Sequence, residues 1–505
     1  MKLISKDISF MSIVILKLIF SILFIFHLKD ENSYCFVEEP NTEIGTEEGY
    51  LSSIENLLEN GEYYYDGIFA NGKMYAPRVP GVSLSYLLFR FFFPKIIALN
   101  CLIIFQSLIF LVSLFFFSKT LLKSDSEIYK SMIFTFLFGL DTYLSFYNHI
   151  PFLGESFSTS ITLFSLYFLY RLQSDLKNRH ILNFGIFIAL SFFFRVPNIV
   201  LILSSIIIFI YLLVSLKTPV KKALFKFLIL IAPFILMEST WIVRNYIKTD
   251  RFIPFQEIVG ASDINIMNQR KDIYKSCVNF CKSFGGDWIQ WNPKSTMAWF
   301  YTDKYLKNMN FKRPGIEVFP RHIQENPKML EELTKARTYW FMSLDSSKTK
   351  YKREIYIENA VTIFDALKRD IYENHSFLYH IGSRFKTSYN LLFGSSTYYI
   401  PYSFDNASFI EKIIKINSRI IYYIVMIIPL LFFPFYIFKY KFWKNYLIDF
   451  SYISFFGFIS MFGFLFRATE FRQNHLMYLF CMVISINALN KLLDNQWVKK
   501  HLPFT

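Results

Sequence analysis

The chain has 505 residues, of which 53% are hydrophobic and 18% are charged, and its mean hydropathy is +0.31. A soluble protein of this length would carry more charge, so the composition indicates an integral membrane protein. The net charge of +15 does not indicate nucleic-acid binding, because the basic residues are scattered over short segments between apolar runs. Five cysteines are too few for a disulfide framework.

The first apolar run, roughly residues 8–26, contains Lys17 and is followed by no small-residue cleavage site. It is therefore expected to be a signal anchor and not a signal peptide. Nine further runs are about long enough to cross ~30 Å of hydrocarbon. They lie near 96–117, 131–146, 157–170, 181–194, 196–216, 223–243, 420–438, 446–466 and 475–488. These runs predict an all-α polytopic membrane protein with about ten transmembrane helices.

Charge between the runs sets the predicted orientation. If the N-terminus is cytoplasmic, every short cytoplasmic loop is basic, as the positive-inside rule requires. Those loops lie at 119–130, 171–179, 217–226 and 439–444, and the C-terminal tail is basic as well. An acidic segment at 43–82 and the long segment after residue 243 then fall on the outer side.

Three parts follow from this topology. Residues 1–243 form a transmembrane core whose long first outer loop spans 28–95. Residues 244–418 are polar, aromatic and broken by Gly285-Gly286 and several prolines, which predicts a mainly helical extracytoplasmic domain inserted before the last three helices. Residues 419–505 supply those helices and a cytoplasmic tail.

The first outer loop carries the clearest candidates for chemistry. Glu47 and Glu48 come just before an amphipathic helical pattern, and acids at a helix start are favoured by the macrodipole whatever their role. A carboxylate at the membrane surface can also take a proton from an attacking hydroxyl, or hold a divalent metal on a phosphate. Arg78 follows in a Pro-Gly turn, where its guanidinium would match phosphate oxygens, although an arginine near a membrane end usually snorkels to headgroups.

Other ionisable residues converge on the same predicted outer side. Glu155 lies in the first turn of an apolar helix, after a very short outer loop that contains His149, and both a functional and a helix-dipole role are open for it. The remaining candidates at outer helix ends are Arg195, Arg244, Asn245, Arg467 and Arg472. Several arginines on the side that should be poor in positive charge are explained by a ligand bearing phosphate or pyrophosphate.

These motifs, in this order and on this side, resemble the GT-C membrane glycosyltransferases. More narrowly, they resemble glycosyltransferase family 39-like enzymes, the bacterial relatives of protein O-mannosyltransferases and of lipid A aminoarabinose transferases. The resemblance covers roughly residues 1–260. Its elements are the acidic pair before Tyr50, the helix ending in Asn60-Gly61, Arg78-Val79-Pro80-Gly81, Glu155, Phe194-Arg195-Val196-Pro197 and Arg244-Asn245.

The chain departs from the family at the first-loop Asp-Glu, where it has Thr46-Glu47. Either Glu47 or Glu48 supplies the base with a longer arm, or the activity has been lost. The resemblance implies transfer of a sugar from a polyprenyl-phosphate donor to a lipid, glycan or protein acceptor, outside a bacterial inner or plasma membrane. No cofactor is certain, and whether a divalent metal is needed stays open. The expected partners are the donor, the acceptor and membrane lipids, with no nucleic acid.

The resemblance also assigns roles to the candidate residues. The catalytic residues would be Glu47, Glu48 and Glu155, and the substrate-binding residues would be Arg78, His149, Arg195, Arg244, Asn245, Arg467 and Arg472. Two other interpretations remain. A transporter or flippase of a lipid-linked sugar would place charges near helix centres, where Lys17 and Asp141 are the candidates. A non-catalytic envelope protein would not need its outer arginines and glutamates.

Overall fold

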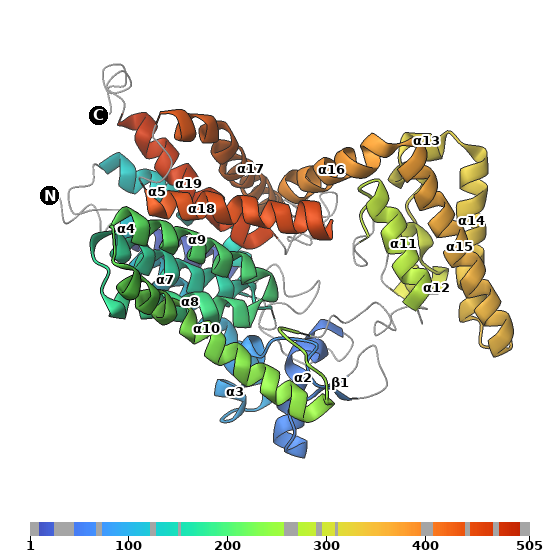
Figure 1. The fold of residues 1–505 in the computed structure, drawn as a ribbon, viewed down its shortest axis with the longest axis horizontal. Coiled ribbons are helices and arrows are strands. Elements are labelled where there is room, and N and C mark those ends of the chain that lie inside the picture. The colour runs from blue at the N-terminus through green and yellow to red at the C-terminus, as the bar shows by residue number, and fades with distance from the viewer. Residues whose placement is uncertain are drawn as a thin grey trace.

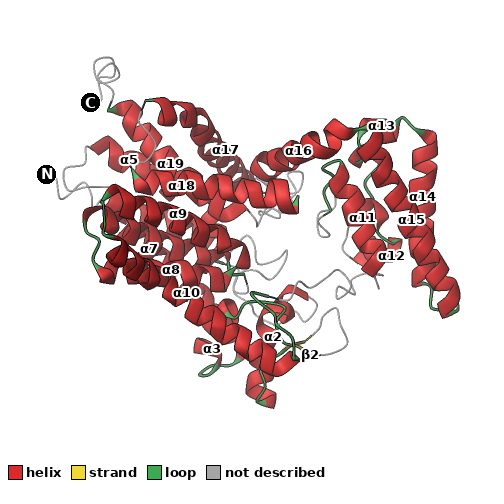
Figure 2. Ribbon diagram, viewed as in Figure 1, coloured by secondary structure: helices red, strands yellow, loops and turns green. Residues whose placement is uncertain are grey.

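The computed structural model describes residues 10–24, 45–66, 73–121, 128–149, 153–256, 271–288, 295–308, 312–394, 408–439, 445–467 and 474–494. Over these residues the protein is all-α (Figure 2), which confirms the predicted class. The described exception is one small antiparallel pair, in which Tyr65 of β1 (Tyr65–Asp66) lies opposite Met74 of β2 (Lys73–Met74).

A bundle of apolar helices forms one part of the molecule (Figure 1). It contains an N-terminal helix (Phe10–Phe24), α4 (Lys95–Leu121), α5 (Ile128–Leu140), α6 (Tyr143–Tyr147), α7 (Glu155–Ser174), α8 (Asn178–Phe194), α9 (Ile199–Ser215), α10 (Val220–Thr249), α17 (Phe409–Phe438), α18 (Tyr446–Phe458) with the π-helical turn η7 (Ile459–Phe466), and α19 (His475–Leu493). Helix α19 lies at the centre, and every side chain from His475 to Ile486 is buried. Nearly all of these residues are apolar or small, as a helix surrounded on all sides requires.

Five of the described helices are long and apolar enough to cross a membrane: Lys95–Leu121, Val196–Ser215, Phe409–Phe438, Tyr446–Phe466 and His475–Leu493. Three shorter apolar helices are Phe10–Phe24, Lys130–Leu140 and Asn178–Phe194. The predicted count of about ten is therefore not confirmed. The predicted run 131–146 is interrupted, because Asp141 accepts the backbone N–H groups of Tyr143 (3.2 Å) and Leu144 (3.1 Å) and so starts the separate helix α6.

The helices alternate in direction along the bundle. At one end, Lys130 pairs with Asp494 at 2.9 Å, Lys226 donates to the Leu176 carbonyl, and Tyr211 contacts Tyr446. We call it the basic end, because the described residues Lys130, Lys177 and Lys226 of the basic loops lie here. At the opposite end Glu155, Arg195 and His475 meet, and Asn417 donates to the Leu140 carbonyl at 2.9 Å. The alternation is the up-and-down order that the predicted topology requires.

A helical module with its own core stands to one side of the bundle (Figure 1). It comprises α11 (Lys271–Ser283), α12 (Asp303–Asn308), α13 (Arg321–Gln324), α14 (Pro327–Leu344) and α15 (Lys350–Asn374). Its aromatic core includes Phe300, whose ring contacts those of Trp340 and Phe364, all three fully buried. Helix α16 (Ser383–Tyr389), flanked by the π-helical turns η5 (Leu378–Gly382) and η6 (Asn390–Gly394), joins the module to the bundle.

The module lies inside the predicted extracytoplasmic domain, but both predicted boundaries fall within continuous helices. Helix α10 runs to Thr249, past the boundary at 243, and α17 begins at Phe409, before the boundary at 418. The composition changes at these points while the helices continue. The domain division itself stays a prediction.

The described part of the segment predicted to be the first outer loop packs on the opposite end of the bundle through α2 (Gly45–Asn60) and α3 (Gly81–Arg90). Helix α2 ends at Asn60, and the next residue, Gly61, has the left-handed φ of +69° that is common directly after a helix. Glu55 of α2 accepts from Tyr86 at 2.6 Å and pairs with Arg90 at 2.9 Å, which ties the two helices together. A Cβ on Gly81 would lie 2.4 Å from the Phe193 carbonyl oxygen, so α3 starts directly against the end of α8.

Candidate functional site

A buried ion pair joins the start of α7 to the end of α8. The Glu155 Oε1 lies 3.3 Å from the Arg195 Nη1, and the two side chains are 3% and 16% exposed. Helix α8 ends at Phe194 because Arg195 has an extended backbone (φ −152°, ψ 119°), and Pro197 lies in the first turn of the next helical segment, η1 (Val196–Asn198), where a missing N–H is tolerated. A Cβ on Gly154 would lie 2.5 Å from the Phe194 carbonyl oxygen, so only glycine permits this approach of the two helix ends.

Arg195 also contacts His475, which the sequence analysis did not select as a site residue. The Arg195 Nη1 lies 2.9 Å from the His475 Nδ1. Since a guanidinium only donates, Nδ1 accepts, and the proton of this neutral imidazole is on Nε2. The sequence feature that could have indicated His475 is its position at the start of an apolar run, on the same predicted side as the outer arginines. Glu155, Arg195 and His475 together form what we call the bundle-end triad.

A buried polar network fixes the start of α19 and therefore the position of His475. Asn474 accepts a hydrogen bond from the Tyr143 hydroxyl and donates to the Tyr422 hydroxyl at 2.7 Å and to the Leu391 carbonyl at 2.9 Å. Ring centroids of Tyr147 and His475 lie 6.0 Å apart. Buried groups this fully bonded give a single arrangement of the helix end.

His149, one of the predicted substrate-binding residues, lies in the short loop before α7. Its Nδ1 donates to the Ser145 carbonyl at 2.9 Å, and its ring lies 5.4 Å from that of Phe24. Burial lowers the pKa of His149 to about 4, so the ring is neutral at neutral pH. These contacts direct the ring toward the N-terminal helix.

Arg244 holds the first outer loop on α10. It donates to the backbone carbonyls of Tyr63 and Tyr75, and its guanidinium carbon lies 5.1 Å from the Tyr63 ring and 5.0 Å from the Trp241 ring. Asn245 is buried, accepts from Arg244 at 2.9 Å and donates to the Ile253 carbonyl at 3.4 Å. The observed contacts of both residues thus hold the loop, and their predicted role in substrate binding stays a prediction.

A second contact between the loop and α10 is ionic. The Glu62 carboxylate lies 2.8 Å from the Lys248 Nζ and 2.7 Å from the Lys73 Nζ. Hydrogen bonds from Lys248 and then Lys73 lower the pKa of Glu62 to about 2. We call the contacts of Arg244 and Glu62 the loop clasp.

The remaining predicted residues are distributed as follows. Glu47 and Glu48 lie in the first turn of α2, of which the structure describes the backbone. Arg78 is half-buried in the turn before α3. Arg467 follows η7 and donates to the Lys282 carbonyl at 2.8 Å, so it contacts the helical module. Arg472 lies outside the described residues.

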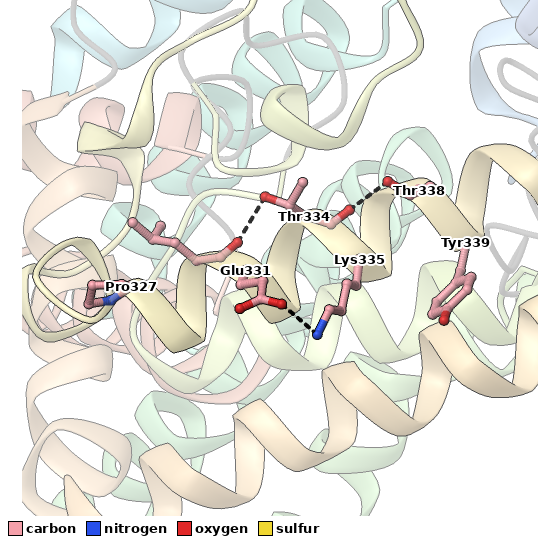
Figure 3. Close-up of a pocket in the computed structure, with 7 residues that line it drawn as sticks. Pro327, Glu331, Thr334, Lys335, Thr338 and Tyr339 are labelled. Carbon is pink, nitrogen blue, oxygen red and sulfur yellow. Dashed lines mark hydrogen bonds and ion pairs between the residues drawn. The ribbon is translucent and has the colours of Figure 1, made fainter.

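One surface depression in the described part of the chain lies away from all of these residues. It has a volume of about 590 Å³ and lies along one helix, α14 (Figure 3). Its lining residues are Pro327, Leu330, Glu331, Thr334, Lys335, Thr338 and Tyr339. Lys335 is paired with Glu331 at 2.8 Å, so the one charged pair in the depression is already neutralised. Within the described ranges, no group of three or more His, Cys, Asp or Glu residues could hold a metal ion.

No protein-family profile, curated protein or solved structure matches this chain. The triad supplies a buried carboxylate, a guanidinium suited to phosphate and a neutral imidazole whose Nε2 carries the ring proton. The loop adds Arg78 and the acidic start of α2 on the same end of the bundle.

Proposed function

We propose that the protein is a GT-C-like membrane glycosyltransferase of about ten transmembrane helices, with a cytoplasmic N-terminus, in a bacterial inner or plasma membrane. It moves a sugar from a polyprenyl-phosphate donor to a lipid, glycan or protein acceptor on the outer side. The observation that carries the proposal is the meeting of the first outer loop with the bundle-end triad. Gly81 and Gly154 both contact the backbone at Phe193 and Phe194, directly before Arg195.

The reaction needs a base and cations in one place. The acceptor oxygen attacks the sugar C1, the bond from C1 to the phosphate oxygen breaks, and the polyprenyl phosphate leaves with the electron pair. A carboxylate takes the acceptor proton, and Glu47 or Glu48 at the start of α2 is the proposed base. Arg78 and Arg195 bind the departing phosphate, since a guanidinium matches two phosphate oxygens. Glu155 acts on Arg195 by holding its side chain in place.

The transport alternative receives no support from Lys17 and Asp141. The Lys17 Nζ lies 2.6 Å from the Asp141 carbonyl, 3.5 Å from its carboxylate and 2.7 Å from the Ser145 hydroxyl. The Tyr478 hydroxyl donates to the Asp141 carboxylate at 3.0 Å. These contacts connect the N-terminal helix to α6 and α19. Such contacts support a structural role for Lys17 and Asp141.

The test is sugar transfer by the purified full chain from a polyprenyl-phosphate sugar donor. Glu47→Gln or Glu48→Gln, whichever removes the base, should lower the rate by about 10²–10⁴-fold, and Arg78→Lys should also lower it. Glu59→Gln is the matched control, because Glu59 is an exposed glutamate at the other end of α2. Wild-type rates in the Glu47, Glu48 and Arg78 variants would exclude the first loop as the catalytic one.

A further inference from the structure

Four cations gather where the helical module joins the bundle: Lys282, Arg384, Lys386 and Arg467. Arg467 donates to the Lys282 carbonyl at 2.8 Å, and its guanidinium lies 5.6 Å from the Tyr379 ring. Arg384 donates to the carbonyl of the same Tyr379 at 3.3 Å. Lys386 of α16 lies against the end of α11, because its Nζ is 5.8 Å from the ring of Phe284, two residues after Lys282. We call these four residues the junction cations.

None of the junction cations forms an ion pair within the part of the chain that the structure describes. Their contacts are with carbonyl oxygens and aromatic rings, which satisfy N–H groups but leave the positive charge uncompensated. Burial and then the charge of Arg467 lower the pKa of Lys282, and burial and then Arg384 lower the pKa of Arg467. Cations that repel one another in a half-buried place are stabilised by an added anion.

An apolar stripe runs along the same helix. Phe377, Ile381, Phe385 and Tyr389 recur every four residues along α16 and its flanking turns, and are 71%, 44%, 62% and 63% exposed. The ring of Phe385 lies 5.9 Å from that of Phe464 in η7. The stripe therefore continues the exposed apolar surface at the end of the candidate span Tyr446–Phe466.

We propose that this junction binds an anionic phospholipid of the surrounding bilayer, whose phosphate lies among the junction cations and whose acyl chains lie along the α16 stripe. An exposed apolar stripe beside uncompensated cations is the combination that the interface of an anionic membrane fits. A soluble phosphate would use the cations and leave the stripe uncovered. The bound lipid would fix the module relative to the bundle, because the cations come from α11, α16 and the end of η7. This inference requires the membrane-spanning bundle and does not depend on glycosyl transfer.

The experiment uses the purified full chain in dodecyl maltoside, titrated with phosphatidylglycerol or phosphatidylcholine and followed by native mass spectrometry. The wild type should bind phosphatidylglycerol more tightly than phosphatidylcholine. Each cation near an anionic lipid surface contributes about 1 kcal/mol, so Arg384→Gln with Lys386→Gln should weaken that binding roughly thirty-fold. Lys352→Gln with Arg369→Gln is the control, since it removes two cations of α15 outside the junction, and it should leave binding unchanged.

Phe385→Ser keeps all four cations and should weaken binding of phosphatidylglycerol through the stripe alone. Equal binding of the two lipids, or no effect of the Arg384 and Lys386 substitutions in correctly folded protein, would overturn the proposal. Displacement of phosphatidylglycerol by inorganic phosphate at similar concentration would show a soluble-anion site instead. Preferential binding of polyprenyl phosphate, with loss of transfer in the double variant, would assign the junction to the donor and would equally overturn the proposal.

Discussion

Replacing Arg195 by methionine tests the bundle-end triad most directly. Methionine fills a similar volume but leaves the Glu155 carboxylate, 3% exposed, without the cation that lies 3.3 Å away. Removing one partner of a buried ion pair leaves an uncompensated charge and costs about 3–5 kcal/mol of unfolding free energy. Glu155→Gln should cost less, about 1.5–3 kcal/mol, because the amide oxygen can still accept from Arg195, and the 16% exposed guanidinium retains some water.

The double substitution separates an interaction from two independent losses. With both charges gone, no buried charge is left unpaired, so the combined cost should fall below the sum of the single costs by about 0.5–3 kcal/mol. The measurement is reversible unfolding of the full chain in mixed micelles by increasing SDS, with Glu59→Gln as a control that should not change stability. Strictly additive costs, or an Arg195→Met protein as stable as the wild type, would show that the two residues are not coupled.

Three further substitutions test the loop clasp and the helix contacts. Arg244→Met removes the donors to the Tyr63 and Tyr75 carbonyls. Hydrogen bonds to a charged group are worth about 1.5–3 kcal/mol, so amide hydrogen exchange in residues 62–66 and 73–78 should become at least about tenfold faster. Unchanged exchange would argue against the clasp. Folding lowers the pKa of Glu62 from 4.5 to about 2, so its stabilising effect is complete above pH 4.5 and is lost as the pH falls toward 2. The stability difference between wild type and Glu62→Gln should therefore narrow on going from pH 5 to pH 3, and a constant difference would contradict this. Gly185→Ala should destabilise the protein more than Gly463→Ala in the SDS unfolding assay. At Gly185 the new Cβ would lie 2.3 Å from a backbone carbonyl oxygen of α10, which cannot move aside. At Gly463 it would lie 2.1 Å from a serine hydroxyl, which can rotate away.

Much of the fold could be predicted because apolar runs and helix breakers are local properties of the sequence. The runs at 96–117 and 196–216 lie within helices at nearly those positions. The break at Asp141 was missed, since an aspartate that caps a helix start is not visible in hydrophobicity alone. The predicted boundary at 243 marks a change of composition, whereas α10 itself continues to Thr249.

The candidate site could be predicted as a list of residues but not as a set of pairs. Glu155 and Arg195 were both selected for their place at outer helix ends, and the structure brings them together. His475 is separated from Arg195 by 280 residues, and no local pattern indicates such a contact. The same holds for Arg467, whose contact with Lys282 depends on how an entire module joins the bundle.

The Lys17–Asp141 pair has a consequence for how the chain is made. A lysine at the centre of a lone helix costs about 2.5–3.5 kcal/mol on entering a bilayer, and the partner of Lys17 is synthesised 124 residues later. At about 5–20 residues per second, that interval lasts roughly 6–25 s. Until α5 and α6 arrive, an N-terminal helix that crosses the membrane as predicted would hold Lys17 without the partners that bind it in the folded chain. The contact with Asp141 and Ser145 would then relieve this cost, so the final packing of the first helix depends on a segment made many seconds later.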